Sequence, residues 1–342
     1  MAALILPTGL PAIAMLRREG IAVVEGESPV PFAEGVQPLT IALVNIMPDK
    51  PTTEVQFGRL LAGADRPVRV VLVLPDGYVP QTADPRHVER FYRRWSEIDR
   101  YELDGIVITG APVEHLAFSA VRYWTGMSAI FNWVSEARLP AMHVCWAAMA
   151  ALWHDHGVPK QDLGEKRFGV YPHVPLNFRS PVLRGVPLPL DMPVSRWAEV
   201  RLSDLPIDGS VRPLALAPVS GLGLAEDPER RAIYLLNHPE YDADTLDREY
   251  ARDRARGIRV ARPDPARTAA RSWEPTGRGL FRNWLTELGR LDLRDRPLGM
   301  LELLLRIQAQ GGASRGSASR GGASMGGASM GGAALACPET RH

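Results

Sequence analysis

The residues best suited to chemistry begin with Cys145, which ends a short apolar run and is followed at once by small helix-forming residues. This pattern predicts a strand over residues 141–144, a tight turn at the cysteine and a helix behind it, which is a nucleophile elbow with Cys in place of Ser. The helix N-terminus would stabilise the thiolate, the reactive form of the side chain. On this stretch alone, a buried structural cysteine explains the pattern equally well.

A histidine and a carboxylate further along the chain supply the partners that such a nucleophile needs. A second apolar run, residues 231–237, stops at His238, and Glu240 follows two residues later. A cysteine nucleophile, a histidine base and a glutamate that orients the histidine form a set that activates a thiol. The set favours the catalytic interpretation of Cys145 and predicts acyl transfer as the reaction class.

Backbone N–H groups that could bind the oxyanion of an acyl transfer lie in two places. The candidates belong to Trp146, directly after the nucleophile, and to Gly110 and Ala111, where glycine allows close backbone approach. No metal and no bound cofactor is expected.

Short apolar runs alternate with amphipathic segments in the first part of the chain. This alternation predicts an α/β protein with a doubly wound, mostly parallel sheet. We expect strands over residues 40–46, 68–74, 105–109, 141–144 and 231–237. We expect helices after an N-cap at Thr52 or Thr53, over 87–98 with an earlier start at Asp84 and Pro85, and over 119–135, 244–256 and 277–290.

The second half of the chain is less regular. Residues 171–193 predict a loop-rich excursion, with short antiparallel strands through Val200 and residues 212–220. Sites in doubly wound sheets form at the carboxyl ends of strands. The loops at residues 45–50 and 110–114 should therefore meet Cys145 and His238 at one edge of the sheet.

Composition and charge narrow the class of protein. The 342 residues are 45% hydrophobic and carry a net charge of +1, which favours a soluble globular protein and gives no support for a nucleic-acid partner. The two cysteines, Cys145 and Cys337, make a disulfide framework improbable and fit a reducing compartment. No signal peptide or membrane span is recognised, so a cytoplasmic location is expected.

Three regions are expected along the chain. Residues 1–35 predict an N-terminal arm packed on the domain, and residues 36–308 predict the main domain. Residues 309–342 contain a five-residue repeat rich in Gly, Ala, Ser and Met, which has too little apolar surface to fold, so a flexible tail with an exposed, non-catalytic Cys337 is expected.

The motifs resemble those of the bacterial homoserine O-acyltransferases, a family with a class I glutamine-amidotransferase-like (flavodoxin-like) fold. The matching stretches keep the family's order and spacing from residue 45 to residue 252. They are residues 45–54, 105–112, 123–124, 144–147, 165–166, 169–171, 195–196, 238–242 and 249–250 with Arg252.

The resemblance implies a ping-pong transfer in methionine biosynthesis. Cys145 would take an acyl group from acyl-CoA, which is a co-substrate, and pass it to an amino-acid hydroxyl with the help of His238 and Glu240. The same motif match implies that Lys166, Ser195 and Arg252 bind the amino acid. Its carboxylate suits a bidentate arginine, although Ser195 could equally be a capping serine.

Only three of the 40 basic residues are lysines, which draws attention to each of them. A compact point charge at these positions is not interchangeable with arginine. Lys166 suits a charged-substrate role, whereas Lys50 and Lys160 match family motifs but could be structural.

In the family, the position matched by Glu114 resembles a filter for the acyl donor. A glutamate would fill the pocket and repel a succinyl carboxylate, so acetyl-CoA is the expected donor. The chain departs from the family pattern at Ser119-Ala120, at Trp197 and in a shortened loop over residues 257–266. L-Homoserine is the leading acceptor, and L-serine or O-succinyl transfer stays open.

Two other classes of function remain. A glutamine amidotransferase could use the same fold and set, but it usually has glycine two residues after the nucleophile, where Ala147 stands. A non-enzymatic binding module is the second alternative, against which the intact set of Cys145, His238 and Glu240 counts. Small-molecule substrates are the expected partners, and a homodimer is left open.

Overall fold

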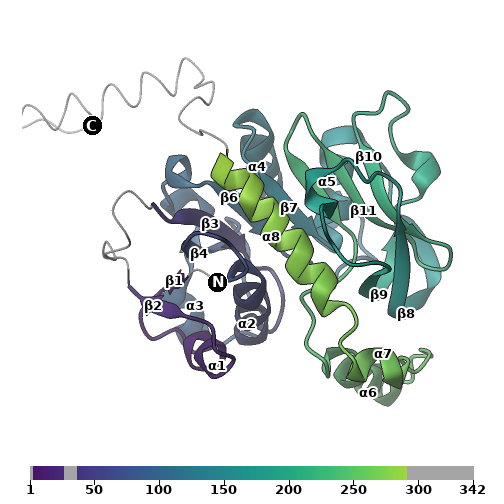
Figure 1. Ribbon diagram of the computed structural model, residues 1–342, viewed down its shortest axis with the longest axis horizontal. Helices are drawn as coiled ribbons and strands as arrows, with labels where there is room; N and C mark the ends of the chain where they lie inside the picture. Colours follow the sequence, from purple (N-terminus) through teal and green to yellow (C-terminus); the bar gives the residue numbers. More distant parts are fainter. Residues whose placement is uncertain (1–2, 27–36, 291–342) are drawn as a thin grey trace, which may run out of the picture. The chain divides into compact units, whose positions relative to one another are not determined.

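A 12-stranded sheet organises the protein in a computed structural model that describes residues 3–26 and 37–290 (Figure 1). The strand order is β2-β1-β4-β3-β6-β7-β12-β11-β10-β8-β9, and β5 pairs with β4. The strands are β1 (Leu4–Leu6), β2 (Val23–Glu25), β3 (Leu39–Val44), β4 (Val68–Leu74), β5 (Arg93–Arg94), β6 (Gly105–Ile108), β7 (Ala141–Val144), β8 (Gln161–Pro175), β9 (Leu190–Glu199), β10 (Arg212–Ala217), β11 (Gly221–Asp227) and β12 (Ala232–Leu235).

The pairing divides the sheet into two parts. Every pair from β2 to β12 is parallel, and every pair from β12 to β9 is antiparallel. The central strands β6, β7 and β12 are buried along their whole length, as expected for parallel strands covered on both faces. The predicted doubly wound, mostly parallel α/β fold is confirmed.

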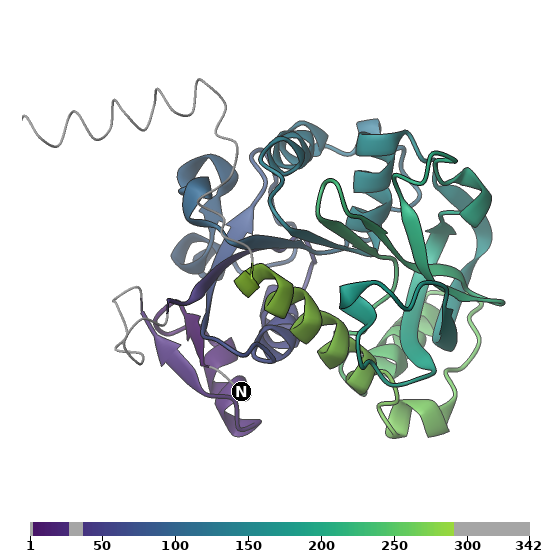
Figure 2. The same cartoon turned by 45° about the horizontal axis from the view of Figure 1, so that its top comes forward.

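The described residues form the helices α1 (Ala12–Arg18), α2 (Lys50–Leu61), α3 (Pro85–Phe91), α4 (Trp124–Glu136), α5 (Trp146–His156), α6 (Thr245–Ala255), α7 (Pro265–Ala269) and α8 (Glu274–Arg290). Helices cover both faces of the parallel part. Helices α2 and α8 pack together on one face, whereas α4 and α5 pack together on the other (Figure 2). This arrangement leaves the carboxyl ends of β3, β6, β7 and β12 at one edge of the sheet.

Several helix ends differ from the sequence prediction. Helix α2 begins earlier than expected because Asp49, rather than Thr52 or Thr53, is its N-cap: the Asp49 side chain accepts a hydrogen bond from the Thr52 N–H. Helix α3 has the predicted Asp84 cap but ends at Phe91 instead of Ile98.

Two further predicted segments also differ. The helix expected over residues 119–135 is a 3-10 turn, η3 (Phe118–Ala120), followed by α4. The loop-rich excursion over residues 171–193 instead holds the end of β8, the 3-10 turn η4 (Pro181–Leu183) and the start of β9. The many prolines of this stretch predicted loops, and β8 is partly exposed along much of its length, so it lacks a strand-like apolar pattern.

The first residues belong to the sheet. Residues 1–35 were expected as an arm, and within their described part β1 pairs in parallel with β4 and carries β2 at the edge. The predicted tail, residues 309–342 with Cys337, lies outside the described residues. In the described ranges, no helix is long and apolar enough to cross a membrane.

Candidate active site

Cys145 stands at the junction between β7 and α5 in a strained backbone conformation. Its φ of 53° and ψ of −116° are unusual for a residue with a side chain, and it is the N-cap of α5. Its N–H donates to the Leu235 carbonyl at 2.7 Å, and its own carbonyl accepts from the Ala148 N–H at 3.0 Å. The geometry is that of the predicted nucleophile elbow.

His238 follows β12, the strand that pairs with β7, and its imidazole is held by Glu240. The Nδ1 to Oε1 distance is 2.6 Å, and both side chains are almost fully buried. Burial works against the imidazolium, but the charges of Cys145 and Glu240 and hydrogen bonds to both side chains raise the pKa of His238 well above its ordinary value. The arrangement therefore favours the imidazolium form of His238 beside Cys145.

Two of the oxyanion candidates, Gly110 and Trp146, lie close to Cys145. A Cβ added to Gly110 would lie 3.1 Å from the Cys145 Cβ and 3.6 Å from the Trp146 nitrogen, so only glycine fits here without displacement. Trp146 begins α5 and its side chain is fully buried. Ala111 lines the same cavity as Cys145.

A cavity of about 330 Å³ opens over Cys145. Most of the residues singled out from the sequence line it together, although they come from segments far apart in the chain. These residues are Gly110, Ala111, Glu114, Cys145, Lys166, Ser195, His238 and Arg252. Glu240 lies behind His238 and lines a neighbouring cavity.

Lys166 is placed in the cavity by β8 and is held by two acidic residues of α6. Its Nζ lies 2.6 Å from Asp253 Oδ2 and 3.2 Å from Glu249 Oε2. Ser195, from the paired strand β9, donates a hydrogen bond to the same Glu249 oxygen. Burial opposes the charge of Glu249, but Lys166 and Ser195 outweigh it, and the pKa of this carboxyl is lowered.

Arg252 completes this cluster at its solvent side. Its side chain is 49% exposed, and Nη2 lies 2.9 Å from Asp253 Oδ1 and 3.9 Å from Glu249 Oε2. The four charged residues, two cations and two anions, balance one another. A zwitterion that enters the cavity would therefore meet groups of both signs.

Glu249 and Tyr241 are the functional candidates that sequence reasoning missed. Tyr241 stacks on the His238 ring, with centroids 4.4 Å apart and planes 21° apart, and its hydroxyl donates to Glu249 Oε1 at 2.9 Å. Tyr241 thus joins the histidine to the charged cluster. The available signal was the spacing of Glu249, Arg252 and Asp253, which places them on one face of a helix.

Glu114 faces the same cavity and is nearly buried. Burial raises the pKa of its carboxyl above the ordinary value, although His238 and Lys166 act in the opposite direction. The Lys160 ammonium donates a hydrogen bond to the Glu114 carbonyl, which gives this lysine a role in holding the loop.

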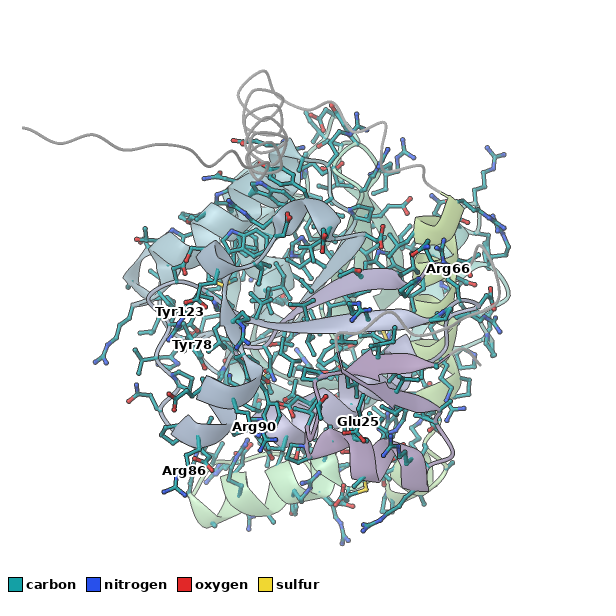
Figure 3. The ribbon with its side chains drawn as sticks, turned by 90° about the vertical axis from the view of Figure 1, so that its left-hand side faces the viewer. Glu25, Arg66, Tyr78, Arg86, Arg90 and Tyr123 are labelled. Atoms are coloured by element: carbon teal, nitrogen blue, oxygen red, sulfur yellow. The ribbon has the colours of Figure 1, made fainter. Side chains whose placement is uncertain are left out.

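Lys50 is fully buried beneath the loop that follows β3. Its Nζ donates to the carbonyls of Asn45 and Met47 and lies 4.9 Å from the centre of the Tyr78 ring. Figure 3 shows Tyr78 beside Tyr123, with ring centroids 4.8 Å apart. Burial lowers the pKa of Lys50 to about 7.

No group of three or more histidine, cysteine or acidic side chains in the described ranges could hold a metal ion.

The fold and the site together define a doubly wound α/β protein with a cysteine, histidine and glutamate gathered at the carboxyl edge of its sheet. The chain belongs to the homoserine O-succinyltransferase family, whose model matches residues 3–289, and it is therefore an acyltransferase. The predicted family resemblance is confirmed.

Curated relatives match over nearly their whole length. The homoserine O-acetyltransferase of Hyphomonas neptunium is 39% identical over 289 residues, which cover 82% of this chain and 94% of that protein. The homoserine O-acetyltransferase of Novosphingobium aromaticivorans is 40% identical over 281 residues, covering 81% and 93%.

Solved structures are similar at much lower identity. The crystal structure of SMU.1228c has a TM-score of 0.51 and 12% identity, covering 73% of this chain and 100% of that one, and it supports the fold alone. A glutamine amidotransferase from Methylobacillus flagellatus has a TM-score of 0.47 and 15% identity, covering 74% and 95%.

Proposed function

We propose that this acyltransferase is a homoserine O-acetyltransferase of methionine biosynthesis. It would convert acetyl-CoA and L-homoserine to O-acetyl-L-homoserine and CoA through an acetyl-cysteine intermediate. The observation that carries the proposal is the shared cavity, in which Cys145 and His238 lie beside a charge-balanced cluster that suits an amino acid. Both relatives described above bear the same activity in their names.

In the first half-reaction the Cys145 thiolate attacks the acetyl carbonyl of acetyl-CoA. The carbonyl oxygen becomes an oxyanion, which the N–H groups near Gly110, Ala111 and Trp146 would bind. When the intermediate collapses, the carbon–sulfur bond to CoA breaks and His238 gives its proton to the departing sulfur. An acetyl thioester on Cys145 and neutral His238 remain.

In the second half-reaction the hydroxyl of homoserine attacks this thioester. His238 takes the hydroxyl proton while the new carbon–oxygen bond forms, and Glu240 stabilises the resulting imidazolium at a distance of 2.6 Å. Loss of the Cys145 thiolate releases O-acetyl-L-homoserine and restores the starting pair of charges.

The acceptor would be recognised by the cluster around Glu249. The ammonium group of homoserine matches the carboxylate of Glu249, which is also held by Ser195. The carboxylate of homoserine matches Arg252, whose planar guanidinium can bind both oxygens. Lys166 neutralises the buried acids and contributes the second positive charge of the cluster.

Glu114 would select the acyl donor. It lines the cavity that holds Cys145, so its side chain takes up space where a longer acyl group would extend. A succinyl group carries a carboxylate that an ionised Glu114 would repel, whereas an acetyl group carries none. Acetyl-CoA would be the co-substrate. A cytoplasmic location stays a prediction, and a homodimer is left open.

Release of free CoA from acetyl-CoA tests the activity directly. The purified full chain should release CoA with L-homoserine faster than with L-serine or L-threonine, and faster from acetyl-CoA than from succinyl-CoA. Intact-mass spectra without acceptor should show one acetyl adduct, which Cys145→Ala abolishes. A folded protein that never forms this adduct would end the proposal, and a preference for serine would correct the acceptor.

A further inference from the structure

Arg196 is a buried cation behind the candidate active site. It lies on β9 directly after Ser195 and is 1% exposed. Its Nη1 donates to the Leu236 carbonyl at 3.1 Å and to Asn237 Oδ1 at 2.5 Å, and its Nη2 donates to the Ser220 carbonyl. None of these acceptors carries a charge, and within the described residues the guanidinium forms no ion pair.

Burial of a guanidinium without an acidic partner destabilises the folded protein, so its presence needs an explanation. Burial lowers the pKa of Arg196 only to about 10, so it stays a cation at neutral pH. The groups whose charge favours the Arg196 cation are Cys145, Glu199 and Tyr171, whereas Arg167 repels it. The charge of the nucleophile is thus among the few that can balance Arg196.

Two of the three acceptors of Arg196, Leu236 and Asn237, lead directly to His238. The carbonyl of the preceding residue, Leu235, accepts a hydrogen bond from the Cys145 N–H at 2.7 Å, so Arg196 and Cys145 bind consecutive carbonyls of one segment. Arg196 therefore contacts the segment that positions both Cys145 and His238.

His173 fixes the amide of Asn237 in the orientation that Arg196 requires. Its Nδ1 is 3.0 Å from the Tyr171 carbonyl, which can only accept a hydrogen bond, so Nδ1 carries the proton. The unprotonated Nε2 then accepts from Asn237 Nδ2 at 3.0 Å and from Ser220 Oγ at 3.2 Å. Burial lowers the pKa of His173 to about 4, which keeps this tautomer neutral.

We infer that Arg196 is a positioning residue of the acyl-transfer site: it holds the chain that carries His238 and places a fixed positive charge near the Cys145 thiolate. The inference rests on the proposed function only in taking Cys145 as the nucleophile. The charge and the hydrogen bonds of Arg196 can be tested separately. A lysine at this position keeps the positive charge but lacks the planar guanidinium that forms the hydrogen bonds.

The pH dependence of Cys145 alkylation by iodoacetamide tests the charge without any substrate. Peptide mass spectrometry separates Cys145 from Cys337. Arg196→Gln should move the alkylation midpoint to higher pH by about one unit, since it removes a nearby positive charge. Arg196→Lys should keep the midpoint within about 0.3 unit of the wild-type value.

Asn237→Asp gives an independent test that preserves side-chain shape. The new carboxylate would lie against Arg196 and neutralise its effect, so the midpoint should again rise, even if Arg196→Gln fails to fold. Arg201→Gln is the matched control: Arg201 follows β9, its side chain is 57% exposed, and among the described residues its ion pair is with Glu199 at 3.6 Å. It should leave the midpoint unchanged.

The positioning role is read from turnover. Arg196→Lys should lower kcat for CoA release at least tenfold at the pH optimum, with far-UV circular dichroism unchanged. Wild-type midpoints in both Arg196→Gln and Asn237→Asp would overturn the charge role, and wild-type kcat in Arg196→Lys would overturn the positioning role. Failure of the proposed function is distinguishable, because it would appear as a missing acetyl adduct in the wild-type enzyme.

Discussion

Replacing Glu240 by glutamine removes the negative charge that faces His238 while keeping the shape of the side chain. The two groups are 2.6 Å apart and almost completely shielded from water. Glu240 and the Cys145 thiolate together raise the pKa of His238 against the effect of burial. The variant loses the carboxylate that faces the imidazolium directly, so the pKa of His238 must fall.

The expected loss follows from the kind of hydrogen bond. A bond to a charged group contributes about 1.5–3 kcal/mol, and each 1.36 kcal/mol changes a rate tenfold. Glu240→Gln should therefore lower kcat/KM roughly 10- to 150-fold. The alkaline limb of the pH–rate profile, where the imidazolium loses its proton, should move down by about 1–2 pH units.

Initial rates of CoA release between pH 6 and pH 10 measure both quantities. Glu229→Gln, at an exposed position after β11, is the matched control and should behave as wild type. Thermal unfolding at pH 7 verifies that each variant is folded. A Glu240→Gln enzyme with an unchanged alkaline limb would show that the carboxylate does not stabilise the imidazolium, and the assigned role would be wrong.

Three further perturbations address the donor, the acceptor and the buried lysine. Glu114→Gly should raise the ratio of succinyl-CoA to acetyl-CoA turnover by about tenfold; an unchanged ratio would place the donor filter elsewhere. Tyr241→Phe removes the hydroxyl that holds Glu249 at 2.9 Å, so KM for homoserine should rise roughly tenfold while acetylation of the enzyme is retained. Burial lowers the pKa of Lys50 to about 7, so the unfolded state binds more protons between pH 7 and pH 10 and the free energy of unfolding rises with pH. In urea unfolding, wild type should gain about 2 kcal/mol between pH 7 and pH 9 relative to Lys50→Met; equal pH dependence would contradict the shift.

The parallel part of the fold could be predicted from the sequence because its strands are buried on both faces. Residues 68–74 and 141–144 are mostly apolar, each with a single polar residue, and the structure confirms them as β4 and β7. The end of α3 could not be predicted. Tyr92 leaves the helix, and its hydroxyl donates to Glu54 at 2.7 Å, a partner 38 residues away.

The same contrast applies to the candidate site. Cys145, His238 and Glu240 each follow a recognisable strand, so sequence spacing could bring them to one edge. Arg196 lies in a stretch that matches the family, but no sequence spacing linked it to His238. Its contacts join β9 to residues 24 to 41 positions further along the chain, and only the antiparallel part of the sheet brings them together.

The strained backbone at Cys145 is surrounded by closely packed, buried residues. A residue with a side chain at a φ of 53° costs on the order of 1–3 kcal/mol, and the conformation persists only if the surroundings prevent its relaxation. Helix α5 is fully buried from Trp146 to Leu152, and Gly110 packs directly against the elbow. Relaxation of the Cys145 backbone would turn its sulfur away from His238. We therefore expect the strained conformation to be required for Cys145 and His238 to act together.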